Sequence, residues 1–125
     1  MAERNLAQVE EDLRQADRHL EELDCKEREL LELEQEVTDL QRASFETWAD
    51  LDQVQLSKKG DLIRQDFLDQ LSQNNHLLAE ELDQRWQNLK KAKRQAEDRF
   101  EHLQIERKRL YRLEDERDKE QANGN

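Results

Sequence analysis

Apolar residues recur along the first part of the chain in steps of three and four, with polar residues between them. This is the heptad rhythm of a helix that packs along one stripe. The first stripe consists of Leu6, Val9, Leu13, Ala16, Leu20, Leu23, Leu30, Leu33, Val37 and Leu40. A second stripe at helical spacing consists of Phe67, Leu71, Leu78, Leu82, Leu89, Ala92, Ala96, Leu103, Leu110 and Leu113. The pattern predicts two long helices.

The two stripes are separated by the polar run "SKKGD" at residues 57–61. Gly60 is the only glycine in the body of the chain, and there is no proline. Glycine takes the left-handed conformation that stops a helix, and aspartate is a good N-cap, so we expect Gly60 to end one helix and Asp61 to start the next. The predicted boundaries are helix one at about 3–57, a turn at about 58–61, helix two at about 62–119 and a disordered tail at 120–125.

The positions of the stripes predict that the helices run antiparallel. Facing residues of a hairpin have position numbers with a constant sum, and the pairs Ala16 with Leu103 and Leu23 with Ala96 both give 119. The charge distribution also supports the antiparallel arrangement. Residues 10–36 have a net charge of −8, and residues 83–109, which would face them, have a net charge of +4. The predicted fold class is therefore all-α, one domain over residues 1–125, an elongated, coiled-coil-like antiparallel two-helix hairpin. Dimerisation into a four-helix bundle stays open.

Composition narrows the classes of function. Charged residues make up 42% of the chain and aromatic residues 5%, too polar for a thick globular core. The net charge of −11 disfavours nucleic acid as a partner, and the basic run "KKAKR" at 90–94 faces the acidic arm. No apolar stretch is long enough for a membrane span, and the N-terminus lacks the apolar segment of a signal peptide, so we expect a cytoplasmic protein.

Residues that carry chemistry are scattered. His19, His76 and His102 are isolated, and Cys25 is the only cysteine. There is no metal-ligand spacing, phosphate-binding glycine loop or nucleophile motif. We therefore predict no catalytic residue, cofactor or metal site, and no enzymatic activity.

The aromatic residues are more than one thin hairpin seam can bury. Unburied apolar surface of this kind usually marks an interface. The candidates for a partner interface are Phe45, Trp48, Phe67, Trp86 and Phe100. Packing within the chain or its homodimer and packing against a different helical partner are equally compatible with this pattern.

"YRLED" places Tyr111 and Asp115 four residues apart, on one helical face. A tyrosine and an acid at this spacing near the end of a helical hairpin resemble the export motif of type VII (ESX) secretion substrates. The pair is therefore a candidate export signal.

The layout as a whole resembles the LXG-associated α-helical proteins of Gram-positive bacteria, in particular the subgroup that lacks the WXG turn. The likeness includes "FETWADLDQ" before the bend, then "RQDFLDQL", "LAEELDQRWQNLKKAKRQAEDRFEHL" and "ERKRLYRLEDERDKE". Trp48 is followed by Ala49 and Asp50, so the tryptophan–glycine turn of WXG-type substrates is not carried over.

This resemblance implies a targeting factor or chaperone that binds the helical N-terminal domain of a cognate LXG toxin and promotes its export by the type VIIb system. A second small helical partner and co-export without a cleaved signal peptide are also implied. The alternative is a spectrin-like or coiled-coil scaffold fragment, because "LDQRWQNLKKA" is similar to the tryptophan-bearing helix of a spectrin repeat.

Overall fold

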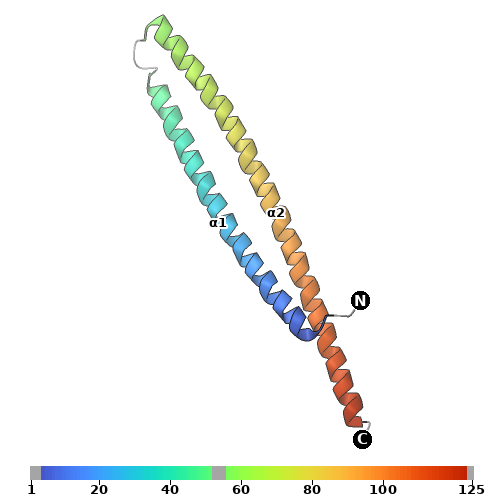
Figure 1. The fold of residues 1–125 in the computed structure, drawn as a ribbon. Helices are drawn as coiled ribbons and strands as arrows, with labels where there is room; N and C mark the ends of the chain where they lie inside the picture. The colour runs from blue at the N-terminus through green and yellow to red at the C-terminus, as the bar shows by residue number, and fades with distance from the viewer. Residues whose placement is uncertain (1–3, 52–55, 124–125) are drawn as a thin grey trace. The chain divides into compact units, whose positions relative to one another are not determined.

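The computed structural model describes residues 4–51 and 56–123, which form two α-helices. Helix α1 (Leu6–Asp50) has 45 residues and helix α2 (Lys58–Asn123) has 66. The helices run in opposite directions and pack against each other, and the described residues contain no strand (Figure 1). The predicted all-α hairpin is confirmed.

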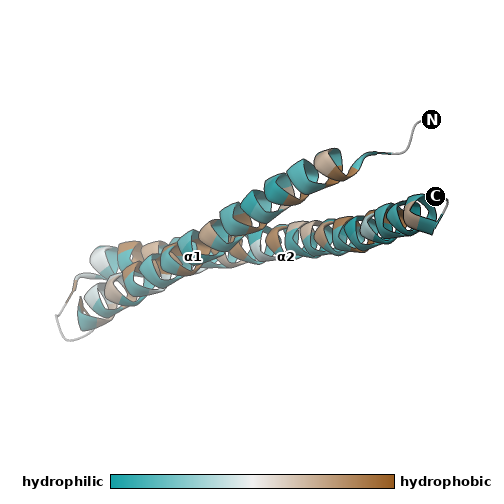
Figure 2. Cartoon of the chain, turned by 90° about the horizontal axis from the view of Figure 1, so that it is seen from below, coloured by the Kyte–Doolittle hydropathy of each residue, from teal (hydrophilic) through white to brown (hydrophobic). Residues whose placement is uncertain are grey.

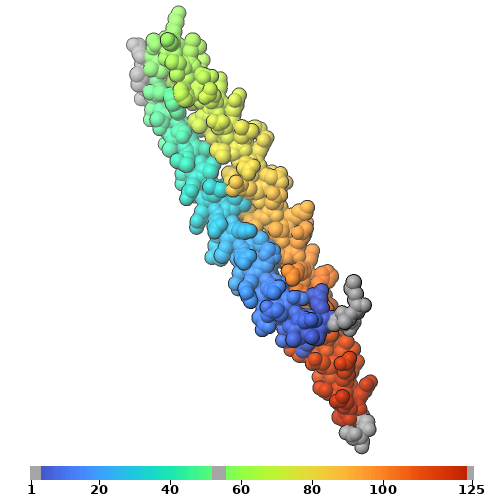
Figure 3. Space-filling model, in the orientation of Figure 1, coloured from blue at the N-terminus to red at the C-terminus, as the bar shows by residue number. Residues whose placement is uncertain are grey.

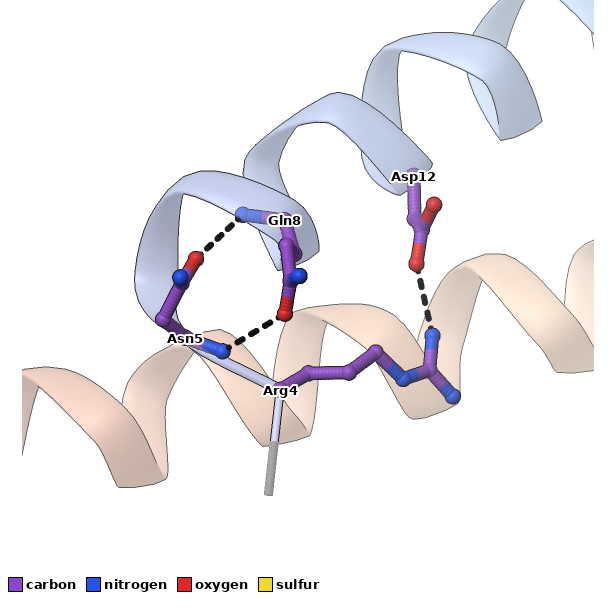
Figure 4. A network of polar contacts seen from close by, with 4 residues as sticks. All are labelled: Arg4, Asn5, Gln8 and Asp12. Atoms are coloured by element: carbon purple, nitrogen blue, oxygen red, sulfur yellow. Dashed lines mark hydrogen bonds and ion pairs between the residues drawn. The ribbon is translucent and has the colours of Figure 1, made fainter. Parts of the chain in front are cut away.

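A capping box starts α1. The side-chain oxygen of Asn5 accepts the backbone N–H of Gln8 at 2.9 Å, and the Gln8 side-chain oxygen accepts the backbone N–H of Asn5 at 3.1 Å (Figure 4). These two bonds satisfy amide groups that have no partner inside the helix. Arg4 adds an ion pair with Asp12 at 2.6 Å, which ties the residue before the cap to the second turn.

The start of α2 differs from the prediction. Gly60 does not end a helix: it lies in the first turn of α2, and none of the described glycines has a positive φ. Ser57 is the cap, because its hydroxyl accepts the Gly60 N–H at 3.1 Å and its carbonyl accepts the Asp61 N–H at 2.9 Å. A serine hydroxyl three residues before Gly60 therefore does what the sequence analysis assigned to Asp61.

Other predicted boundaries also move. Helix α1 ends at Asp50, seven residues before the predicted end at about 57, and residues 52–55 lie outside the described part. Asp61 lies inside α2, where its carboxylate accepts hydrogen bonds from Arg64 at 3.4 Å and Gln65 at 3.3 Å. At the other end, α2 continues to Asn123 and so includes most of the predicted tail.

The chain groups into two compact units. The terminal unit comprises residues 1–26 and 89–125, and the bend unit comprises residues 27–88. Within each unit a segment of α1 lies beside a segment of α2, and their side chains are in contact (Figure 3). The two units are of nearly equal length but differ in how well they bury their apolar residues.

The terminal unit contains a well-packed core. Val9, Leu13, Ala16 and Leu103 form a buried cluster, and Phe100 and Leu110 pack against it. Leu23, Leu89 and Ala96 are also buried. The predicted pairs Ala16 with Leu103 and Leu23 with Ala96 are thus buried on both helices, and each buried leucine or valine stabilises the fold by about 1.5–3 kcal/mol.

The bend unit has a thin core. Among the described residues of this unit, Leu30 is the only buried apolar one. The unit also contains ten of the thirteen large hydrophobic residues that are exposed in the described part of the chain. Several polar residues of this unit are half-buried, among them Gln41, Ser44, Arg64 and Asn75. Hydrophilic residues dominate both helices and hydrophobic ones are interspersed among them (Figure 2). The bend unit therefore leaves apolar surface uncovered.

Candidate partner-binding surface

The five aromatic residues predicted as an interface do not lie in one unit. Phe45, Trp48, Phe67 and Trp86 belong to the bend unit, and Phe100 belongs to the terminal unit. Phe100 is half-buried against the core of Val9, Leu13, Ala16 and Leu103. The packing of the terminal unit thus accounts for Phe100.

Trp48 and Phe67 connect the two helices of the bend unit. Their rings are stacked, with centroids 4.8 Å apart and an interplanar angle of 15°. Such a pair contributes about 0.5–1.5 kcal/mol beyond the area it buries. Trp48 is half-buried by this contact, while Phe67 is still 47% exposed. Phe67 therefore serves the fold and also presents apolar surface.

Trp86 makes the second cross-helix contact of the bend unit. Its indole N–H on α2 donates a hydrogen bond to the carboxylate of Glu34 on α1. The pair borders a shallow groove on one side of the unit, which is otherwise lined by Val37, Thr38, Gln41, Ala79, Leu82 and Asp83. This side of the bend unit is mixed in character and uses its tryptophan within the chain.

The opposite side of the bend unit is apolar. Leu33 and Leu40 are two helical turns apart on α1, and Phe67 and Leu78 share the corresponding flank of α2, with Ile63 one turn before Phe67. Because the helices are antiparallel, these two flanks face the same side of the hairpin. We call this set the apolar row. Its exposed fractions are 36% for Leu33, 69% for Leu40, 50% for Ile63, 47% for Phe67 and 42% for Leu78.

The apolar row corrects the sequence analysis, which places Leu33, Leu40, Phe67 and Leu78 in the inner stripe. On α1 the seven-residue repeat of Leu23, Leu30 and Val37 continues to Ser44, and its intervening positions include Gln41. Gln41 and Ser44 are half-buried, whereas Leu33 and Leu40 fall one residue outside this repeat and are exposed. The sequence analysis followed the apolar residues instead of the unbroken repeat, which runs through polar positions in this part of α1.

Acidic residues are concentrated in the bend unit. The bend unit contains fifteen Asp and Glu against six Lys and Arg, a net charge of −9 out of −11 for the chain. The terminal unit contains seventeen acidic and fifteen basic residues, a net charge of −2. A surface that combines exposed leucines with a strongly negative field can bind an apolar partner of opposite charge.

The predicted export pair lies on the terminal unit. Tyr111 is 48% exposed, and its hydroxyl donates a hydrogen bond to the Glu10 carboxylate at 2.9 Å. The hydrogen bond and the negative charge of Glu10 raise the pKa of Tyr111 above 10.0. Asp115 lies one turn further along α2 and is exposed. Tyr111 is thus held by α1, whereas Asp115 stands at the end of α2 that extends past the start of α1 (Figure 1).

Groups of three or more His, Cys, Asp or Glu side chains that could hold a metal ion do not occur among the described residues. Cys25 is exposed. In the described part of the chain, neither helix contains a stretch apolar enough to cross a membrane.

No protein-family model matches the chain, and neither curated proteins nor solved structures give a match. The fold defines the class: an all-α helical hairpin, with a packed terminal unit and an acidic bend unit that exposes the apolar row.

Proposed function

We propose that this protein is a non-catalytic binding module that uses its bend unit to hold a helical partner. The observation that carries the proposal is the concentration of exposed large hydrophobic residues in the bend unit, ten of thirteen among the described residues. Exposed apolar surface of this extent on a thin scaffold is costly unless a partner covers it. A helical hairpin gains a larger core when a further helix packs along it.

The resemblance of the sequence to the LXG-associated α-helical proteins suggests the partner. In this proposal the hairpin binds the helical N-terminal domain of a cognate LXG toxin in the cytoplasm. It then targets that domain to the type VIIb secretion machinery, with Tyr111 and Asp115 as the export signal. Phe45 and Phe67, which are 41% and 47% exposed, are the predicted aromatic residues best placed to contact the toxin domain.

The proposal is tested by co-expressing the full chain with the N-terminal domain of an LXG toxin encoded beside it and purifying the complex through a tag on one partner. We expect the two chains to co-elute in a defined ratio. A soluble toxin domain that passes through without the hairpin would contradict the proposal. A secretion assay with Tyr111→Ala and Asp115→Ala then tests the signal separately from binding.

The scaffold alternative is less well supported. A spectrin repeat requires three helices, whereas α2 is one uninterrupted helix of 66 residues and the described residues contain two helices in all. The row of exposed leucines in the bend unit is also better suited to a partner helix than to a solvated rod.

A further inference from the structure

We propose that the apolar row binds an amphipathic helix of another protein that carries Lys or Arg on both sides of its apolar stripe. This inference rests on the proposed function and adds the chemistry of the partner. The row follows the axes of two antiparallel helices, with Leu33 and Leu40 on α1 and Phe67 and Leu78 on α2. A third helix laid along such a pair completes the packing of a small bundle.

Acidic side chains border the row on both helices. Glu36 lies three residues after Leu33 and four before Leu40, which places it on the same flank of α1. Glu81 lies three residues after Leu78 on α2, where it pairs with Arg85 at 3.2 Å. Glu36 and Glu81 are both exposed. A helix seated on the row would bring its own flanking positions next to these carboxylates.

The charge distribution argues against a second copy of this chain as the occupant. Two bend units in contact would bring a net −9 against a net −9, and a terminal unit on a bend unit would bring −2 against −9. Neither unit has a net positive charge to complement the acidic border of the row, and the basic segment 83–109 of α2 lies beside the acidic residues 10–36 of the same chain in the predicted hairpin register. Single exposed ion pairs contribute only about 0–1 kcal/mol, but the summed field discriminates between partners of opposite and like charge.

The charge requirement can be measured with the full chain and two synthetic helical peptides of equal length and identical leucine stripe. One peptide carries lysine at the positions beside the stripe, and the other carries glutamate there. Fluorescence anisotropy should show the lysine peptide binding at least about tenfold more tightly, with an affinity that falls as salt is raised. Equal affinities, tighter binding of the glutamate peptide or binding of neither would overturn the inference.

Variants then locate the binding surface. Leu40→Ser combined with Leu78→Ser should lower the affinity for the lysine peptide by about tenfold or more, because both leucine side chains are removed from water when the peptide binds. The matched control is Leu31→Ser combined with Leu77→Ser, since these leucines are 52% and 61% exposed and lie off the row. The control should stay within about twofold of the unmodified chain. Equal losses in both double variants would overturn the assignment, and circular dichroism verifies that each remains helical.

Two further measurements separate the competing explanations. Sedimentation equilibrium of the chain alone should show a monomer. The inference would be overturned by a dimer that the Leu40→Ser, Leu78→Ser variant dissociates and the control variant does not. The row would then bind a second copy of this chain. If an LXG toxin domain co-elutes equally well with both double variants, the proposed function stands and this inference fails. If the lysine peptide binds but the toxin domain does not, the inference stands and the proposed function fails.

Discussion

The indole N–H of Trp86 on α2 donates a hydrogen bond to the carboxylate of Glu34 on α1, and this bond joins the two helices of the bend unit. Leu30 is the only buried apolar residue described in this unit, so a single polar contact between the helices carries more weight here than in the terminal unit. Together with the stacked rings of Trp48 and Phe67, it keeps α1 and α2 side by side where the core is thin.

Trp86→Phe keeps an aromatic ring but removes the donor, so we expect it to lower the free energy of unfolding by about 0.5–1.5 kcal/mol. In a Glu34→Ala background the same substitution should cost less, because the acceptor is already gone. Urea unfolding followed by circular dichroism, arranged as a double-mutant cycle, measures the coupling. A coupling energy indistinguishable from zero would show that the hydrogen bond does not stabilise the hairpin.

The uneven core predicts uneven responses to truncation. Leu103 is 4% exposed in the terminal unit, whereas Leu78 is 42% exposed in the bend unit. We expect Leu103→Ala to destabilise the protein by about 2–4 kcal/mol, through lost burial and the cavity it leaves. Leu78→Ala should cost less, about 1 kcal/mol, because 42% of this residue stays exposed in the folded state and its truncation leaves no enclosed cavity. The same urea measurements compare the two, and equal losses would contradict the assigned burial.

The cap of α2 offers a third prediction. Ser57→Ala removes the hydroxyl that accepts the Gly60 N–H, and we expect a loss of about 1 kcal/mol in stability. Ser57→Asp should retain most of the stability, because aspartate is an equally good cap. Thermal unfolding of the two variants measures the difference, and a Ser57→Ala protein as stable as the parent would exclude this cap.

Gly60→Ala distinguishes the observed bend from the one expected from the sequence. Gly60 is helical, so alanine should stabilise the protein, by up to about 1 kcal/mol. The added methyl group would lie 3.3 Å from the Ser57 hydroxyl oxygen, which must shift slightly and offsets part of this gain. A glycine in the left-handed conformation would instead be destabilised by alanine, so a clear loss of stability would contradict the structure.

The hairpin and the core of the terminal unit could be predicted from the sequence because they depend on a repeating pattern. Ala16, Leu23, Ala96 and Leu103 all keep their expected buried positions. The helix boundaries at the bend were harder to predict. Ser57 and Gly60 are both boundary signals, and only the backbone geometry decides whether such a residue starts a helix or ends one. The exposure of Leu40 follows from the unbroken repeat of Leu23, Leu30 and Val37, which passes through Gln41 instead. The exposure of Leu78 depends on how far α2 rotates in the bend unit, which heptad counting does not describe.

Tyr111 provides a prediction about pH. It is the only tyrosine in the chain, so the absorbance of its phenolate reports a single group. The hydrogen bond to Glu10 raises the pKa of Tyr111 above 10.0, which means that the folded state favours the protonated phenol. The contribution of this contact to stability is therefore fully present below pH 10.0 and is lost as the pH rises through the raised pKa.

Glu10→Gln removes the neighbouring charge and should return the pKa of Tyr111 towards 10.0. The control is Glu11→Gln, at an exposed neighbour on α1, which should leave the pKa of Tyr111 unchanged. A spectrophotometric titration of the three proteins measures these values, and identical pKa values for Tyr111 in the parent and in Glu10→Gln would show that α1 does not hold this tyrosine.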